Sequence, residues 1–148
     1  MAQSLANVLV HMIWSVKDRR SLIQDDLRAA LHGYMAGILK HLESAAVIIN
    51  SVPDHVHILN QLAKTIALCK VIEEVKKSSS KWMKAHGIAD FAWQGGYGAF
   101  SVSQSNADSV REYIQNQAEH QKKLDFKEEF RRFCQRYNVP IDERYVWK

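Results

Sequence analysis

A chain of 148 residues with 47% apolar side chains has the size and composition of one compact domain with a real hydrophobic core. Its 20 Lys and Arg against 16 Asp and Glu leave a formal charge of +4, which suits a polyanionic partner without requiring one. No apolar run approaches the roughly 18 to 20 residues of a membrane span, and the first residues lack the pattern of a signal peptide, so we expect a soluble, cytoplasmic protein. Cys69 and Cys134 fit buried thiols better than a disulfide framework or a zinc site.

The first half of the chain alternates strand and helix patterns. Residues 7–16 are rich in β-branched and aromatic types and end at a polar cluster, which predicts a strand. Apolar positions three and four apart predict an amphipathic helix over residues 24–42. Residues 45–52 and 55–62 predict two antiparallel strands, joined by a turn at Pro53 and Asp54.

The second half repeats the pattern once and then becomes helical. A long helix is expected to begin after an N-cap at Thr65 and to end near residue 85, before Gly87. A short strand is expected at residues 99–103, followed by a helix that Ser105 or Asn106 caps and that runs to about residue 122. Residues 125–137 predict a last helix with four aromatic residues on one face, Phe126, Phe130, Phe133 and Tyr137.

The order β-α-β-β-α-β predicts the α+β class, with a ferredoxin-like antiparallel sheet and two helices on one face. Two C-terminal helices are added to this pattern, and residues 1–148 are expected to form a single domain. The aromatic face of the last helix is too apolar to be left in water, so it must cover the domain or contact a second subunit.

Two histidines follow the predicted turn. Because side chains of a strand alternate between its faces, His55 and His57 point the same way and can share one metal ion. On the predicted helix, Tyr113 and Gln117 are four residues apart and lie on one face. If this helix packs beside the histidine strand, two ring nitrogens and one amide oxygen can bind a divalent cation, and the phenol can attack a phosphorus atom that the cation activates.

These residues stand in segments that resemble a known family. PDHVHIL resembles the HUH motif of rolling-circle and transposition nucleases, and VREYIQNQ resembles the nucleophile helix of the small TnpA transposases of the two-hundred-like group of insertion sequences. The resemblance extends to HMIWSVKDRR, VKKSSSKWMK, WQGGYGAFSVS and the C-terminal tail. The chain departs from the family at Val16, where threonine is frequent, and in lacking a proline after the third strand.

The resemblance to these single-tyrosine HUH transposases implies a function. It implies that Tyr113 is the nucleophile, that His55, His57 and Gln117 bind Mg²⁺ or Mn²⁺, and that a 5′-phosphotyrosine forms with a free 3′-hydroxyl. The partners it implies are single-stranded DNA hairpins at the ends of a mobile element and a second copy of the chain. In such a homodimer, the tyrosine helix of one subunit can complete the histidine site of the other.

Plainer explanations stand beside these assignments. Two histidines in a strand are more often ordinary surface or core residues than metal ligands. Tyr113, taken alone, is typical of an amphipathic helix, with its ring packed and its hydroxyl in water. His120 competes with Gln117 as a ligand, because imidazole also binds divalent metals. Asp54 is interpreted as a turn residue and not as a ligand.

Basic side chains form two groups that can contact DNA phosphates, and the alternative for both is a solvated surface. The groups are Lys17, Arg19 and Arg20 after the first strand, and Lys76, Lys77, Lys81 and Lys84 on the second helix. The glycines of WQGGYG lack the spacing of a phosphate-binding loop, so no nucleotide cofactor is expected.

Two other functions are compatible with this sequence. The first is a domesticated relative that processes dispersed palindromic repeats of its host genome. The second is a non-catalytic module that binds single-stranded nucleic acid on an open sheet face, although the aromatic strand motifs of such modules are not evident.

Overall fold

The computed structural model describes residues 2–148 and contains a four-stranded antiparallel sheet in the order β2-β3-β1-β4. The strands are β1 (Leu9–Ser15), β2 (Ala46–Val52), β3 (His55–Gln61) and β4 (Gly98–Val102). The helices are α1 (Asp25–His41), α2 (Leu68–Ala85), α3 (Ala107–Gln115), α4 (Gln117–His120) and α5 (Phe126–Arg136), with short 3-10 helices η1 (Lys17–Arg19) and η2 (Gln104–Asn106). The predicted α+β class and the order β-α-β-β-α-β of the elements along the chain are confirmed.

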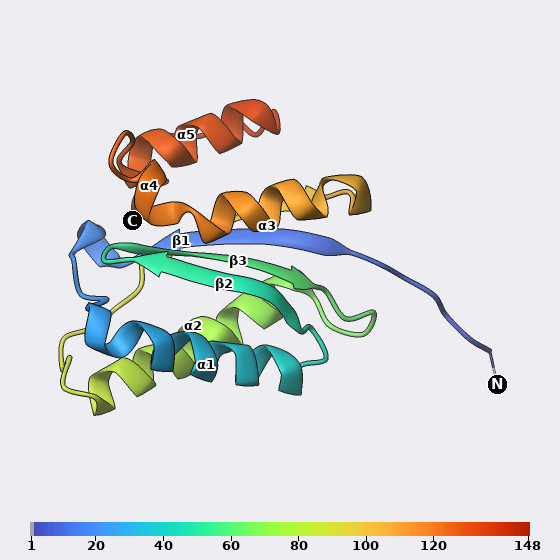
Figure 1. The fold of residues 1–148 in the computed structure, drawn as a ribbon, viewed down its shortest axis with the longest axis horizontal. Helices are drawn as coiled ribbons and strands as arrows, with labels where there is room; N and C mark the ends of the chain where they lie inside the picture. Colours follow the sequence, from blue (N-terminus) through green and yellow to red (C-terminus); the bar gives the residue numbers. More distant parts are fainter. Residues whose placement is uncertain (1) are drawn as a thin grey trace.

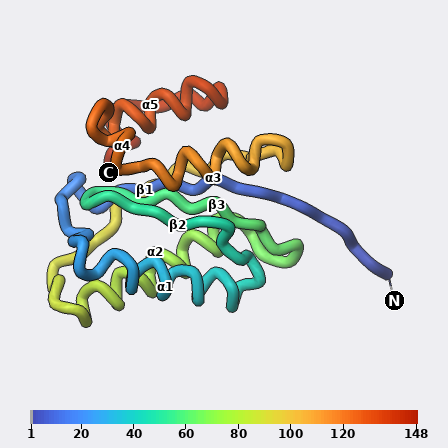
Figure 2. Tube along the Cα trace, viewed as in Figure 1, coloured from blue at the N-terminus to red at the C-terminus, as the bar shows by residue number. Residues whose placement is uncertain are grey.

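Helices cover both faces of the sheet (Figure 1). As predicted, α1 and α2 lie together on one face, and the added helices α3 and α5 lie over the other. The central strand β1 is therefore buried along its whole length, which explains why its sequence is an almost unbroken apolar run. The chain before β1 forms the blue end of the trace in Figure 2 and joins the sheet at Asn7 and Val8, which bond to Gln104 and Leu62.

Each face of the sheet has its own apolar core. The larger core joins Met12 and Trp14 of β1 to Leu31 and Met35 of α1 and to the apolar side of α2. The smaller core joins the opposite face to α5 through a set of buried residues: Ile13, Phe100, Phe126, Phe130 and Cys134. The last helix therefore covers the domain itself, which was one of its two expected roles.

Aromatic stacking closes the sheet face under α5. The ring of Phe100 on β4 stacks with Phe133 at a centroid distance of 5.7 Å and with Tyr137 at 4.8 Å. An open sheet that stacks bases on its aromatics needs such rings exposed to solvent. Because Phe100 is buried beneath α5, the structure counts against a non-catalytic module of that kind.

Two local predictions are wrong. Thr65 is not the N-cap of α2, because residues 64 and 65 form a turn and the helix begins only after Ala67, which has an extended backbone. Cys69 is exposed and not buried, because it lies on the solvent side of the first turn of α2; Cys134 is buried as expected. The end of α2 agrees with the prediction, since Gly87 adopts a left-handed φ of 98° just after it.

The predicted continuous helix over residues 106–122 is also wrong, because it breaks at Asn116 into α3 and α4. The side chain of Asn50 on β2 donates hydrogen bonds to the carbonyls of Ile114 at 2.8 Å and Gln115 at 3.1 Å. Carbonyls at a helix end lack their usual helical partners, so these bonds from Asn50 stabilise the break. The break separates Tyr113 on α3 from Gln117, the first residue of α4.

No helix within residues 2–148 combines the length and the apolar character needed to cross a membrane.

Candidate metal and nucleophile site

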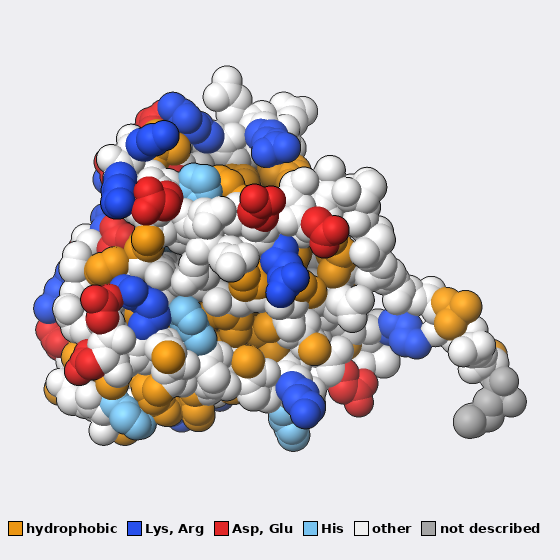
Figure 3. Space-filling model, in the orientation of Figure 1, with side chains coloured by type: hydrophobic (Ala, Val, Ile, Leu, Met, Phe, Trp, Pro, Cys, Tyr) orange, Lys and Arg blue, Asp and Glu red, His pale blue; other side chains and the backbone are white. Residues whose placement is uncertain are grey.

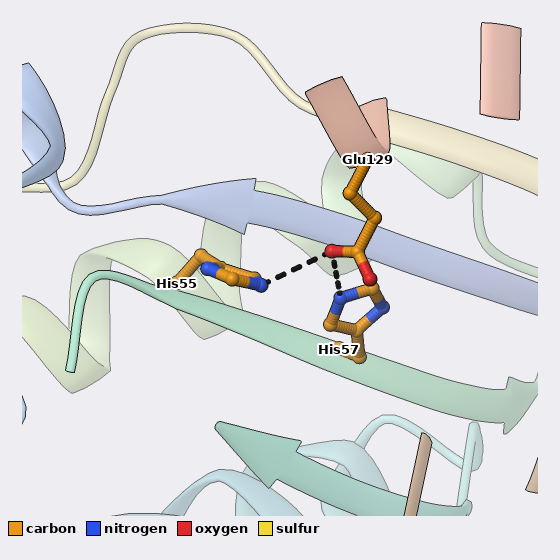
Figure 4. Close-up of side chains that lie close together, drawn as sticks. All are labelled: His55, His57 and Glu129. Carbon is orange, nitrogen blue, oxygen red and sulfur yellow. Dashed lines mark hydrogen bonds and ion pairs between the residues drawn. The ribbon is translucent and has the colours of Figure 1, made fainter. Parts of the chain in front are cut away.

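The two predicted histidine ligands lie side by side on β3. His55 and His57 are both completely buried, and their rings point to the sheet face that carries α3 and α5 (Figure 4). Asp54, which lies in the turn as expected, places Oδ1 2.7 Å from Nδ1 of His55. That contact orients the ring so that Nε2 faces the site.

A carboxylate from α5 completes this pair. Oε1 of Glu129 lies 3.0 Å from Nε2 of His57 and 3.2 Å from Nε2 of His55. Figure 4 shows the Glu129 side chain reaching down from its helix between the two rings. Glu129 is only 1% exposed, so its charge depends on these neighbours and not on water.

The spacing of these three groups fits a divalent cation. Their ligand atoms all lie within 4.8 Å of one another. Adjacent ligands of an octahedral ion with bonds of about 2.1 Å lie roughly 3.0 Å apart, which matches the two distances to the Glu129 oxygen. Two imidazoles and a carboxylate are also donors that divalent metals accept together.

Tyr113 lies against the same carboxylate. Its hydroxyl donates a hydrogen bond to Oε2 of Glu129, and its ring centroid lies 6.1 Å from that of His57. Burial and the negative charge of Glu129 raise the pKa of the Tyr113 phenol well above its ordinary value. The phenol is therefore protonated in this arrangement, and its proton points at the carboxylate.

Gln117 is buried beside this cluster without a hydrogen-bond partner. Its side chain is completely buried, and within residues 2–148 neither its amide nitrogen nor its amide oxygen completes a hydrogen bond. The amide is close enough to Tyr113 to oppose the rise in the phenol's pKa. A buried amide without a partner is unfavourable, and a bound ligand would satisfy it.

His120, which was the alternative to Gln117 as a ligand, lies against the ring of Tyr113. Its ring stacks on Tyr113 at a centroid distance of 4.2 Å and an interplanar angle of 18°. Its Nε2 is buried and has no hydrogen-bond partner in the described part of the chain. His120 thus supports the ring of Tyr113, while His55, His57 and Glu129 form the cluster that could hold a metal ion.

Charge in the cluster is concentrated on Glu129. Burial alone would raise the pKa of its carboxyl, but the two imidazoles outweigh burial and hold that pKa far below its usual range. Burial likewise acts to lower the pKa of His55, but Asp54 and Glu129 raise it above the ordinary value. Burial lowers the pKa of His57. Glu129 acts to raise this pKa, but the neighbouring His55 and His120 act to lower it.

Two residues of this site were missed by the sequence analysis. His11 on β1 is 1% exposed and places Nε2 2.8 Å from Nδ1 of His57, so it orients the ring of this candidate ligand. Glu129 follows Phe126 by three positions and precedes Phe133 by four, which places a carboxylate on the apolar face of its helix. A carboxylate on an apolar helix face is unusual, and this feature of the sequence could have marked Glu129 as a candidate site residue.

The predicted DNA-contacting residues lie apart from this cluster. The lysines of α2 are across the sheet from it, and Lys77, Lys81 and Lys84 are exposed. Lys76 is already used within the chain, since its ammonium donates to the carbonyls of Gln94 at 2.7 Å and Gly96 at 2.8 Å.

The three basic residues of the loop after β1 differ in their surroundings. Arg19 donates to the carbonyl of Trp147 at 3.0 Å, and Arg20 pairs with Asp90 at 2.8 Å. Lys17 is exposed to solvent. The structure thus brings His55, His57, Tyr113 and Gln117 to one place and leaves the basic residues outside it.

The family model for IS200-like transposases matches residues 4–117, which is more than half of the chain. This chain belongs to the IS200-like transposase family. The match includes both histidines, Tyr113 and Gln117, and it ends before Glu129. The third member of the candidate metal cluster therefore comes from outside the matched segment.

Two solved structures share the fold. A candidate transposase from Deinococcus radiodurans R1 is 20% identical, with a TM-score of 0.64 over 79% of this chain and 98% of that chain. A REP-associated tyrosine transposase bound to a REP hairpin is 15% identical, with a TM-score of 0.61 over 81% of this chain and 74% of that chain. The comparison with curated proteins gave no match. The family and the fold thus agree with the resemblance found in the sequence.

Proposed function

We propose that residues 1–148 act as one catalytic domain that cuts and rejoins single-stranded DNA at the ends of a mobile element. Tyr113 is the nucleophile of this proposal, and His55 and His57 are the metal ligands. The observation that carries it is the convergence of both imidazoles and the tyrosine on one buried carboxylate. An ordinary helix tyrosine would instead extend its hydroxyl to water.

The buried polar residues beside Tyr113 fit a metal ion. Glu129 and Gln117 are the candidates for a third protein ligand, one because of its spacing and the other because its buried amide has no partner in residues 2–148. When bound, Mg²⁺ or Mn²⁺ withdraws charge from a phosphate oxygen and stabilises the departing sugar oxygen.

The side chains of the protein supply the rest of the chemistry. The phenol oxygen of Tyr113 bonds to the phosphorus as the bond from phosphorus to the 3′ oxygen breaks, which leaves a 5′-phosphotyrosine and a free 3′-hydroxyl. The phenol proton is released to water as the new bond forms, because the low pKa of Glu129 makes that carboxylate a poor acceptor of the proton to which it is now hydrogen-bonded. The 3′ oxygen takes a proton from water. Because the phosphodiester energy is kept in the phosphotyrosine, a 3′-hydroxyl can reverse the step and no nucleotide cofactor is needed.

Partners of the protein follow from the same proposal. The substrates are single-stranded hairpins at the element's ends, and a homodimer is the expected assembly. Within one chain, Tyr113 already contacts Glu129 of the histidine site. Exchange of the tyrosine helix between two subunits stays a prediction.

End-labelled single strands from the flanks of the gene, incubated with the protein and Mn²⁺, test this function. A labelled covalent adduct is expected with the parent protein and is expected to disappear with Tyr113→Phe. Tyr34→Phe is the matched control, because Tyr34 is 40% exposed on α1, across the sheet. An adduct that survives Tyr113→Phe, or that forms equally well in EDTA, contradicts the proposal.

Processing of dispersed palindromic repeats is the second candidate function. The observation that favours it is the shared fold with a REP-associated tyrosine transposase bound to a REP hairpin. The DNA around the gene separates the two candidates, since terminal hairpins that flank the gene indicate mobility. Substrate hairpins scattered through the genome without such flanks indicate a domesticated enzyme.

A further inference from the structure

Two hollows open on either side of Tyr113. The larger has a volume of about 480 Å³ and lies between the end of β4, α3 and α5. The smaller, of about 190 Å³, lies beside Glu129 and Arg132. Both hollows are lined by Tyr113, Phe133 and Arg136, so the proposed nucleophile stands on the wall between them.

The walls of the larger hollow differ in chemistry. The side formed by η2 and α3 carries small polar side chains, among them Asn106 and Ser109. The opposite side carries the ring of Phe133 on α5 and that of Tyr137 at the end of this helix. Aromatic rings that face hydrogen-bonding groups suit a planar nucleobase, which stacks on one wall and bonds to the other. The volume lies within the roughly 300 to 1,000 Å³ of pockets that bury a small molecule.

His11 connects this hollow to the histidine pair. Its ring lines the hollow, and its Nε2 contacts His57. The other ring nitrogen, Nδ1, is buried and lacks a hydrogen-bond partner in the part of the chain that the structure describes. A buried polar atom without a partner, on a ring that is 1% exposed, indicates that something else binds here.

Positive charge lies at the mouth of both hollows. Arg136 is exposed and forms no ion pair within residues 2–148. Arg132, one turn earlier, reaches only Glu128, at 3.7 Å. Figure 3 shows Lys and Arg side chains gathered over α5 at the top of the molecule. Residues four apart share a helix face, so the two guanidinium groups can hold successive phosphates of one strand.

We propose that the larger hollow binds the nucleotide next to the scissile phosphate of single-stranded DNA. Its base leaves the stack of the strand and lies against Phe133 and Tyr137, while Arg136 holds its phosphate. This inference rests on the proposed function and names a substrate contact for the same site. α5 thereby has two roles, because it supplies Glu129 to the metal cluster and Arg136 to the DNA.

Binding of a fluorescein-labelled octamer of deoxythymidine, measured by anisotropy in the Tyr113→Phe background, tests the inference without cleavage. Arg136→Gln is expected to weaken binding about tenfold and to reduce the slope of log affinity against log salt by about 0.7, the value for one phosphate on a single strand. Arg111→Gln, on the exposed side of α3, is the matched control and should change affinity less than twofold.

A second variant tests the base contact without changing charge. Ser109 is exposed at the hollow, one turn before Tyr113 on α3, so Ser109→Phe fills the space without burying a new side chain in the core. Stacking of one base contributes roughly 1 to 3 kcal/mol, so a loss of at least fivefold is expected, with an unchanged salt slope. Equal losses for Arg136→Gln and Arg111→Gln, or parental binding by Ser109→Phe, overturn the inference.

The two proposals can fail separately. If the hollow variants weaken binding but Tyr113 forms no adduct with any flanking strand, the hollow stands as a DNA site and the proposed chemistry fails. If adducts form at the parental rate at limiting DNA in both hollow variants, the chemistry stands and the hollow is not the site.

Discussion

The Tyr113 phenol donates a hydrogen bond to one oxygen of Glu129, while the other oxygen of that carboxylate faces His55 and His57. One residue of α5 therefore contacts the candidate nucleophile and the candidate metal ligands at once. The helix that carries it is fixed by Phe126 and Phe130, which are buried against the sheet. The packing of α5 against the sheet therefore also places Glu129 in the site.

Glu129→Gln should weaken metal binding, because it removes the negative charge of the three-residue cluster and keeps the size of the side chain. We expect the affinity for Mn²⁺, measured by calorimetry on the DNA-free protein, to fall by about tenfold or more. Glu128→Gln is the matched control, since its side chain is 47% exposed on the same helix. Equal affinities for the two variants, or tighter binding by Glu129→Gln, would show that the carboxylate is not a ligand.

Gln117→Leu should separate stability from function. Leucine has a similar volume and carries no polar atoms, so it removes the buried amide that lacks a partner in residues 2–148. The metal-free protein should gain about 1 kcal/mol of unfolding free energy, because the desolvation cost of that amide disappears. In the same melts, the rise in Tm that Mn²⁺ produces should shrink. Gln115→Leu, at an exposed position, is the control. A loss of stability in Gln117→Leu that the control does not show contradicts the prediction.

Much of this site could be predicted from local patterns in the sequence. The alternation of a strand places His55 and His57 on one face whatever the rest of the fold does, and both were found to converge. The break after Gln115 could not be predicted, because the carbonyls at the helix end are bonded by Asn50 from a strand far away in the sequence. A continuous helix and a broken one have the same local pattern, and only the tertiary contact decides between them.

Glu129 and His11 show a different limit of sequence analysis. Each is a polar residue on an apolar face, so the pattern marks it as unusual but does not say what it contacts. His11 and Glu129 share one partner, His57 on β3. This partner lies 46 residues from His11 and 72 residues from Glu129 in the sequence. Only the sheet order, with β1 beside β3, and the docking of α5 bring them to His57.

Gly98→Ala should loosen α5 from the sheet. A Cβ at Gly98 would lie 2.7 Å from Cε2 of Phe130 and 3.0 Å from Cγ2 of Ile13, so the aromatic ring or the helix must move. We expect a loss of about 1 to 3 kcal/mol of unfolding free energy and weaker Mn²⁺ binding, because Glu129 lies one residue before Phe130. Gly33→Ala, in α1 with nothing within 4 Å of its new Cβ, should instead stabilise the protein by about 0.5 to 1 kcal/mol. An unchanged affinity for Mn²⁺ in a destabilised Gly98→Ala protein would show that the site does not depend on this packing.

His32 should make stability depend on pH below neutrality. Its ring on α1 lies 2.8 Å from the Ser51 hydroxyl, and burial, followed by the charge of Arg28, lowers the pKa of His32 from 6.5 to about 4. Between these two values the unfolded chain binds a proton that the folded chain does not. The contribution of His32 to the free energy of unfolding is therefore complete above pH 6.5 and declines as the pH falls toward 4.

Urea unfolding of His32→Gln from pH 7.5 to pH 4.5 measures this contribution. Glutamine can still bond to Ser51 but does not titrate, so the stability of the parent relative to this variant should be constant above pH 7 and should fall steadily below pH 6.5. The control is His41→Gln on the same helix, whose exposed ring meets water in the folded and the unfolded chain alike. A difference between parent and His32→Gln that stays constant over the whole range would show that His32 accepts a proton in the folded protein as easily as in water.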